Sequence, residues 1–245
     1  MPDSRSPDHA AKSLTPAQIA ELGRIDTPTI CNLLEMVAPQ RRGHGYTTRH
    51  LQCAFPDLPP IVGYAKTATI RAKEPGPLSG PDNLALRFGY YDYVVDGPAP
   101  RVSVIQDLDD HHPGYGSFWG EVNSNVHKAL GCVGGITNGS IRDLPMLAEG
   151  FQLLAGSVGP SHAFVHLVSF DCEVNVHGMV VRSGDLIHAD RHGAVVIPRD
   201  VADKLAGALD LLMRQEAVII EAARDPGFTV EMLKDAIRKS VSITY

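Results

Sequence analysis

The spacing of hydrophobic side chains predicts helices near the start of the chain and a strand after them. Two segments begin with Thr-Pro, which places an N-cap before a proline at the first helical position. We therefore expect helices that begin at Thr15-Pro16 and at Thr27-Pro28. Hydrophobic and polar residues alternate over Ile61–Arg71, as in a strand. The pattern also predicts a helix at 84–95, a strand at 101–106 and loops at 39–60 and 75–81.

The middle of the chain is predicted to contain a helix, a buried strand and a second, short helix. Ser117 can cap a helix that stops at Gly131. Cys132–Thr137 is predicted to be a buried strand, and Asn138-Gly139, a pair that is common in turns, is expected to end it. Ile141–Leu147 is expected to form the short helix that follows.

The pattern changes in the second half, where short hydrophobic runs are separated by glycine-containing pairs. These runs extend over Phe164–Pro198 and predict several short strands, arranged as a barrel-like or swivelled sheet. Asp200–Ala223 then has hydrophobic residues at helical spacing, and Glu231–Lys239 is expected to form a last helix. The chain is therefore predicted to be α/β, with a flexible N-terminal tail at 1–13 and a single domain at 14–245.

Composition and charge make some classes of partner and location less plausible. The formal net charge of the 245 residues is −6, which disfavours non-specific binding to nucleic acid. The four cysteines form no Cys-x-x-Cys pair, so reduced thiols are the simpler interpretation. No apolar run approaches the ~20 residues that span a bilayer, and the first residues lack the apolar segment of a signal peptide. We expect a cytoplasmic protein that binds neither nucleic acid nor membrane.

The best candidate for a chemical site is the segment from Gly131 to Asp143. A buried strand leads into a glycine-containing turn, and Arg142 and Asp143 follow it. Ligands of α/β folds bind at the carboxyl ends of strands. An arginine fork suits a carboxylate, and an aspartate oxygen suits Mg²⁺ or Mn²⁺. The alternative interpretation is a surface arginine beside an aspartate that caps a helix.

A second candidate lies at the start of the preceding helix. The free backbone N–H groups of a helix N-terminus bind anions, and Glu121 in the segment Phe118–Asn123 is placed to hold a metal-bound water. The alternative is a first-turn glutamate that the helix dipole stabilises. His111-His112 is interpreted as part of a solvated loop. The sequence shows no Walker loop, no dinucleotide-binding glycine motif and no nucleophile elbow.

These segments resemble the RraA-like family, which includes the 4-hydroxy-4-methyl-2-oxoglutarate aldolases and the regulator of ribonuclease activity A. The resemblance rests on Gly120-Glu121 with the segment from Gly131 to Asp143, on Val180–Asp190 running into Gly193–Pro198, and more weakly on Ile61–Thr67. It implies a swivelling β/β/α fold with flanking N- and C-terminal helices. It also implies homotrimers or homohexamers with the site at a subunit interface.

The resemblance assigns a metal site. Asp143 matches the direct ligand of Mg²⁺, for which Mn²⁺ or Co²⁺ are substitutes, and Glu121 matches the acid that holds a metal-bound water. A further acidic residue belongs to the C-terminal helix of a neighbouring subunit. Glu216 is our choice for this role, with Glu221 as the second choice.

The resemblance also assigns a site for a small 2-oxo acid. Arg142 matches the residue that holds the pyruvoyl oxygens. Gly120 belongs to the same motif, and the backbone N–H groups of Val122 and Asn123 match those that bind the pyruvate carboxylate. Arg142, Glu121 and Asp143 are accordingly the expected catalytic residues.

Two positions depart from the family pattern. The aldolases usually have an acidic residue where this chain has Met146, and an Asp-Gly turn where it has Asn138-Gly139. The loop 107–117 is also longer and richer in histidine. These departures bear on the identity of the substrate rather than on the metal site.

The implied function is that of a metal-dependent class II pyruvate aldolase. Such a lyase cleaves a 4-hydroxy-2-oxo acid through a pyruvate enolate, and decarboxylation of oxaloacetate would accompany the same site. The alternative is a non-catalytic regulatory protein, like the ribonuclease regulator. A methyltransferase ranks last, because no glycine-rich dinucleotide-type loop follows a strand.

Overall fold

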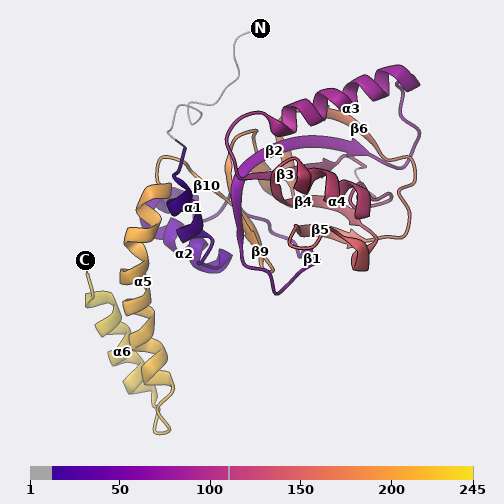
Figure 1. Cartoon of the computed structure of the whole chain (residues 1–245). Helices are drawn as coiled ribbons and strands as arrows, with labels where there is room; N and C mark the ends of the chain where they lie inside the picture. The colour runs from indigo at the N-terminus through magenta and orange to yellow at the C-terminus, as the bar shows by residue number, and fades with distance from the viewer. Residues whose placement is uncertain (1–12, 110, 245) are drawn as a thin grey trace.

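The computed structural model describes residues 13–109 and 111–244. Nearly all of the tail predicted at 1–13 therefore lies outside the described residues. The described part is a mixed α/β structure, in which a strongly curved sheet has helices on its outer face and a long helical hairpin extends from one side (Figure 1). The expected α/β class with flanking N- and C-terminal helices is confirmed.

A parallel set of strands forms the centre of the sheet. The four strands are β2 (Ile61–Arg71), β3 (Arg101–Asp107), β4 (Cys132–Ile141) and β5 (Gln152–Val158). Each pairs in parallel with the next, so their carboxyl ends meet at one edge. Helices α3 (Gly80–Val95) and α4 (Glu121–Ala129) make the first two crossovers, and both lie on the outer face of the sheet (Figure 1).

Antiparallel strands extend the sheet and curl it. Because β2 is long, β9 (Leu186–Asp190) pairs with its first half and β6 (His166–Phe170) with its second half. β10 (Gly193–Ile197) continues beyond β9, and β1 (Gln52–Cys53) borders β5. In the described residues this gives an eight-stranded sheet and a separate ribbon of β7 (Val174–Val176) and β8 (Met179–Val181). The ribbon packs on the inner face with buried residues such as Val102 and Ile136.

The terminal helices cover a second core. The elements α1 (Pro16–Leu22), α2 (Thr27–Val37), η2 (Pro39–Arg41) and α5 (Ala202–Ala223) surround β9 and β10. His188 of β9 fixes the turn between α1 and α2, since its ring nitrogens lie 3.0 Å from Thr27 Oγ1 and 2.9 Å from the Ile25 carbonyl oxygen. α6 (Val230–Ser242) folds back on α5. No helix in residues 13–109 or 111–244 is long and apolar enough to cross a membrane.

Three of the predictions for the middle of the chain are wrong. Gly120, and not Ser117, is the N-cap of α4, because Ser117 instead pairs its hydroxyl with that of Ser140 at 2.7 Å. Asn138-Gly139 forms no turn, since β4 continues through it with a shift of register against β5. The helix expected at Ile141–Leu147 is only the short 3-10 helix η3 (Leu144–Met146).

The other predicted elements are confirmed within a few residues. Strand β2 has the predicted bounds, and α1 follows the predicted N-cap Thr15, whose side chain forms a capping box with Gln18. α2 begins at Thr27 as predicted, although its N-cap side chain is that of Asp26. The short strands after Phe164 and the two C-terminal helices are present. Strand β5 was not predicted.

Candidate functional site

The site predicted around Arg142 forms where β4 ends beside the start of α4. The backbone N–H of Arg142 donates to the carbonyl oxygen of Trp119 at 3.0 Å, and Ile141 forms a parallel bridge with Trp119. Asp143 then has left-handed backbone angles, φ 57° and ψ 37°. A non-glycine residue rarely has a positive φ, and such residues are common at functional sites. This turn stops the strand and directs the Asp143 side chain toward α4.

Asp143 contacts the first turn of α4 directly. Its Oδ2 accepts a hydrogen bond from the backbone N–H of Glu121 at 3.3 Å. A Cβ atom at Gly120 would lie 2.6 Å from the same oxygen, so this approach requires glycine. Arg142 Nε lies 3.6 Å from Oδ2, and both side chains remain about one-third exposed. The two neighbouring side chains thus form an ion pair that stays partly exposed.

The N-terminus of α4 offers further hydrogen-bond donors. The backbone N–H groups of Val122 and Asn123 have no acceptor in the described part of the chain. Such donors, together with the helix dipole, favour an anion. The side chain of Glu121 is exposed at the same turn. The structure therefore brings together Gly120, Glu121, Val122, Asn123, Arg142 and Asp143, as the resemblance implies.

Buried hydrogen bonds hold the first turn of α4 in place. His127 Nδ1 donates to the Asn123 carbonyl oxygen at 2.7 Å, so its Nε2 accepts from the Tyr90 hydroxyl at 2.8 Å. Ser103 lies 3.1 Å from the Tyr90 oxygen and completes the chain of hydrogen bonds to β3. Burial lowers the pKa of His127 to about 4, so the ring is neutral. Sequence reasoning missed this support, because a single histidine in a helix gives no signal of its partner.

The two departures from the family pattern have different structural contexts. The Asn138 side chain accepts from the Asp107 N–H at 2.7 Å and donates to the Asp107 carbonyl oxygen at 2.9 Å. An aspartate lacks the donor for the second bond. Asn138 therefore ties β4 to the end of β3. Met146 is 55% exposed and lies beside the exposed Leu144, in η3 directly after Asp143.

The acidic residues predicted to come from the C-terminal helix do not meet Asp143 within one chain. Glu216 lies on α5, where its Oε1 is 3.4 Å from Asn32 Nδ2 of α2. Glu221 lies further along the same helix and is exposed. Figure 1 shows α5 on the opposite side of the sheet from α4. Neither residue belongs to the Asp143 site of its own chain.

The donors near Asp143 fit a magnesium ion that keeps most of its water. No group of three or more His, Cys, Asp or Glu residues that could hold a metal occurs in the described residues. Mg²⁺ commonly binds through one or two carboxylates and several waters. Oδ1 of Asp143 accepts no hydrogen bond within the described chain, and the side chain of Glu121 is exposed at the same turn. These hard oxygen donors suit Mg²⁺ or Mn²⁺.

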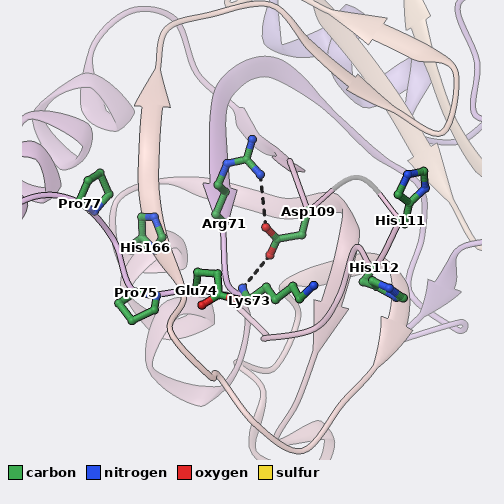
Figure 2. Close-up of a pocket in the computed structure, with 9 residues that line it drawn as sticks. All are labelled: Arg71, Lys73, Glu74, Pro75, Pro77, Asp109, His111, His112 and His166. Atoms are coloured by element: carbon green, nitrogen blue, oxygen red, sulfur yellow. Dashed lines mark hydrogen bonds and ion pairs between the residues drawn. The ribbon is translucent and has the colours of Figure 1, made fainter.

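A hollow of ≈430 Å³ lies at the same edge of the sheet, beyond the ends of β2 and β3. Figure 2 shows the Asp109 carboxylate between Arg71 and the backbone of Lys73. His111 and His112 line the opposite wall and are exposed, in agreement with their interpretation as a solvated loop. Neither Arg142 nor Asp143 lines this hollow.

A smaller hollow of ≈180 Å³ adjoins the candidate site. Arg87 and Tyr91 of α3 line one wall, and Phe118, Asn123 and His166 line the others. The amide of Asn123 donates to the Phe118 carbonyl oxygen at 2.6 Å, which fixes that wall. Sequence reasoning missed Arg87, because nothing in the sequence places α3 beside the start of α4.

Comparison with known proteins places these observations in a family. A family model described as RraA-like, Aldolase/RraA, matches residues 27–196. Protein DlpA of Legionella pneumophila is 23% identical over 144 residues, which are 56% of this chain and only 22% of that protein. The chain therefore matches less than a quarter of the length of this relative.

Two solved structures resemble the fold. An uncharacterized protein from Pseudomonas syringae pv. tomato has a TM-score of 0.69 at 20% identity, over 94% of this chain and 96% of that one. Streptomyces coelicolor RraAS2, described as an unusual member of the RNase ES inhibitor RraA protein family, has a TM-score of 0.65 at 20% identity, over 84% and 96%. At these identities the likeness shows a shared fold.

Proposed function

The chain belongs to the RraA-like family, and from this we propose that it is a divalent-metal-dependent carbon–carbon lyase that acts on a 4-hydroxy-2-oxo acid through a pyruvate enolate. The family contains both enzymes and inhibitors of ribonuclease. The choice between these two functions therefore depends on the residues of the site. The observation that carries it is the contact of Asp143 with the first turn of α4, beside Arg142. This contact brings the Asp143 carboxylate and the Arg142 guanidinium to the free backbone donors of α4, at the turn that carries Glu121.

Each group has a defined role in the proposal. The N–H groups of Val122 and Asn123 bind the substrate carboxylate at the helix N-terminus. Arg142 donates to the oxygen at C2, where negative charge develops as the C3–C4 bond breaks. A divalent metal held by Asp143 supplies Lewis-acid stabilisation of the same oxygen when it is bound.

The proton balance involves Glu121. The C3–C4 bonding electrons pass to the enolate, while the C4 hydroxyl loses its proton and becomes the carbonyl of the leaving fragment. Glu121, exposed at the first turn of α4, takes up this proton directly or through water. The proton held by Glu121 then passes to C3 of the enolate, directly or through water, and gives pyruvate. Oxaloacetate would give the same enolate with CO₂ as the leaving fragment.

The hollow beside Asn123 provides a place for the leaving fragment. Phe118 and Tyr91 offer apolar walls, and Arg87 offers a positive charge. An acidic group on the leaving fragment would therefore be favoured there. Met146 differs from the acid that the aldolases have, and its exposed side chain makes the surroundings of Asp143 more apolar.

We further propose that the protein forms a homotrimer or homohexamer. Asp143 and Glu121 supply only part of a metal shell, and Glu216 or Glu221 would complete it from a neighbouring subunit. Mn²⁺ or Co²⁺ would replace Mg²⁺, the substrate would be a small 2-oxo acid, and the protein would act in the cytoplasm without nucleic acid.

The test is release of pyruvate from a 4-hydroxy-2-oxo acid by the purified protein. We expect release with Mg²⁺ or Mn²⁺ and its loss when EDTA is added. Release that is unchanged by EDTA would exclude the metal-dependent lyase.

A non-catalytic binding protein is the second candidate. Val122, Leu144 and Met146 are exposed hydrophobic residues around the site, and such residues favour a protein partner. Absence of pyruvate release from every 2-oxo acid tested, with metal present, would favour this function.

A further inference from the structure

A small hollow is lined by α2, by the loop that follows η2 and by β10, and it has no role in the proposed chemistry. Both α2 and β10 lie on the side of the sheet away from α4 (Figure 1). The volume of the hollow is ≈150 Å³, and neither Arg142 nor Asp143 lines it. An apolar cavity of about 150 Å³ holds a molecule of benzene. The hollow is therefore large enough for a small organic ligand.

The side chain of Arg41 is held against the backbone at this hollow. Gly45 has a φ of 90°, and a Cβ atom there would lie 2.6 Å from Arg41 Cζ, so the position of the guanidinium requires glycine. Nη2 of Arg41 donates to the Val196 carbonyl oxygen at 3.3 Å. These two contacts fix the guanidinium beside β10.

Arg41 keeps hydrogen-bond donors that are available to a ligand. A guanidinium has five N–H donors, and among residues 13–109 and 111–244 the acceptor of Arg41 is the Val196 carbonyl oxygen alone. Its Nε is buried without an acceptor, although buried donors are usually paired. No carboxylate of the described chain forms an ion pair with Arg41. A buried donor without a partner indicates that an acceptor is supplied from outside the chain.

The other ionisable groups that line the hollow do not compensate the charge of Arg41. Glu35 pairs with Arg42 at 2.9 Å, so two arginines face one carboxylate. His44 is exposed. Burial raises the pKa of the Cys31 thiol, which is therefore neutral at pH 7 and does not repel an anion. The rest of the lining is largely apolar and comes from Leu34, Tyr46 and Val195.

From these observations we infer that the hollow binds a short-chain monocarboxylate of the size of butyrate. The carboxylate pairs with the free N–H groups of Arg41, whose planar fork suits two oxygens. The alkyl chain lies against Leu34, Tyr46 and Val195. Inorganic phosphate fits less well, because it has no apolar part to bury. This site is separate from Asp143 and does not depend on the proposed lyase activity.

Protection of Cys31 from alkylation tests the inference on the whole protein. The protein is treated with iodoacetamide at increasing concentrations of sodium butyrate, and peptide mass spectrometry follows the alkylation of each cysteine. Because Cys31 lines the hollow, we expect butyrate to slow its alkylation in a saturable manner. Cys172 is the internal control, since it is also partly buried and does not line the hollow. Its rate of alkylation should not change.

A variant and an uncharged analogue test the role of Arg41. Arg41→Gln should need about tenfold or more butyrate for the same protection, since it loses charge-assisted hydrogen bonds. Arg214→Gln is the matched control, because Arg214 pairs with Asp210 on α5 and does not line the hollow, and it should behave as the unmodified protein does. Butyramide should not protect Cys31 in the unmodified protein. This comparison does not require the variant to fold.

Three results would overturn the inference. One is a rate of Cys31 alkylation that butyrate does not change. Another is equal protection by butyramide, chloride or inorganic phosphate at the same concentration, which would show that the hollow has no preference for a short carboxylate. The third is equal protection by butyrate in Arg41→Gln, shown to be folded by its thermal unfolding.

Discussion

The carboxylate of Asp143 accepts the backbone N–H of Glu121 at 3.3 Å, so the end of β4 and the start of α4 meet in one hydrogen bond. Twenty-two positions separate the two residues in the chain. The bond places an acidic side chain at a helix N-terminus, where the dipole stabilises negative charge. The candidate site exists because this contact holds Asp143 next to free backbone donors.

Gly120→Ala should damage the site while leaving the fold intact. The new Cβ would lie 2.6 Å from Asp143 Oδ2, so the carboxylate has to move away from α4. We expect pyruvate release to fall by roughly 10²-fold, the size of effect that follows loss of preorganised geometry. The control is Gly207→Ala in α5, where a Cβ meets nothing within 4 Å. It should keep activity and raise the free energy of unfolding by up to about 1 kcal/mol.

Arg142→Lys should lower turnover by about 10²–10³-fold, because lysine lacks the planar fork that reaches two oxygens. Measurement of kcat for oxaloacetate decarboxylation checks this. Arg238→Lys is the control, since Arg238 is exposed and pairs with Asp235 on α6. Unchanged kcat in Arg142→Lys would remove Arg142 from the mechanism.

Arg87→Gln should affect binding more than chemistry. Arg87 lines the hollow beside Asn123, where we propose that the leaving fragment lies. For a 4-hydroxy-2-oxo acid with a terminal carboxylate, we expect KM to rise about tenfold with kcat little changed. For a substrate with an uncharged tail, KM should not change. Equal effects on both substrates would argue against this role.

Asn138→Asp should destabilise the fold. The aspartate would lose the hydrogen bond to the Asp107 carbonyl oxygen and place a carboxylate against it. We expect the free energy of unfolding in urea to fall by about 1–3 kcal/mol. Asn175→Asp is a matched control, because the Asn175 side-chain oxygen accepts from Gly178 and an aspartate can do the same. The interpretation fails if the two variants are equally stable.

Stability should decrease in mild acid. Burial lowers the pKa of His127 to about 4 from 6.5, and burial also lowers the pKa of His188. The unfolded chain therefore binds more protons than the folded one, and stability falls as pH drops below about 6.5. Between pH 7.5 and 5, His127 alone should cost about 2 kcal/mol. Urea unfolding at the two pH values measures this decrease in the free energy of unfolding. His127→Gln should make the decrease smaller. The control, His44→Gln at an exposed position, should leave it unchanged.

Short-range sequence patterns predict most of the helices and strands, but they do not predict the turn at Asp143 that forms the site. The capping box of Thr15 and the alternation in β2 depend on nearby residues, so sequence alone reveals them. Asn138-Gly139 resembles a turn locally, but the Asn138 side chain pairs with the backbone of β3 and keeps the strand extended. Ser117 resembles an N-cap, yet its hydroxyl pairs with Ser140. In both cases a distant contact overrides the local preference.

The sequence motif identifies the candidate site residues. Contacts between distant segments of the fold determine how these residues are arranged. Arg142 and Asp143 were identified as residues that follow a strand, and the structure places them at its end. The left-handed backbone of Asp143 and the support of α4 by His127 depend on contacts with distant segments. No sequence pattern reports such contacts. The same holds for Glu216, whose proposed role requires a neighbouring subunit.

The metal-dependent lyase is best tested by release of pyruvate from oxaloacetate, measured for the unmodified protein and for Asp143→Ala, with Mg²⁺ and with EDTA. We expect release that requires metal and that falls by roughly 10²-fold or more in the variant. Equal release by Asp143→Ala, or no release by the unmodified protein with Mg²⁺ present, would contradict it.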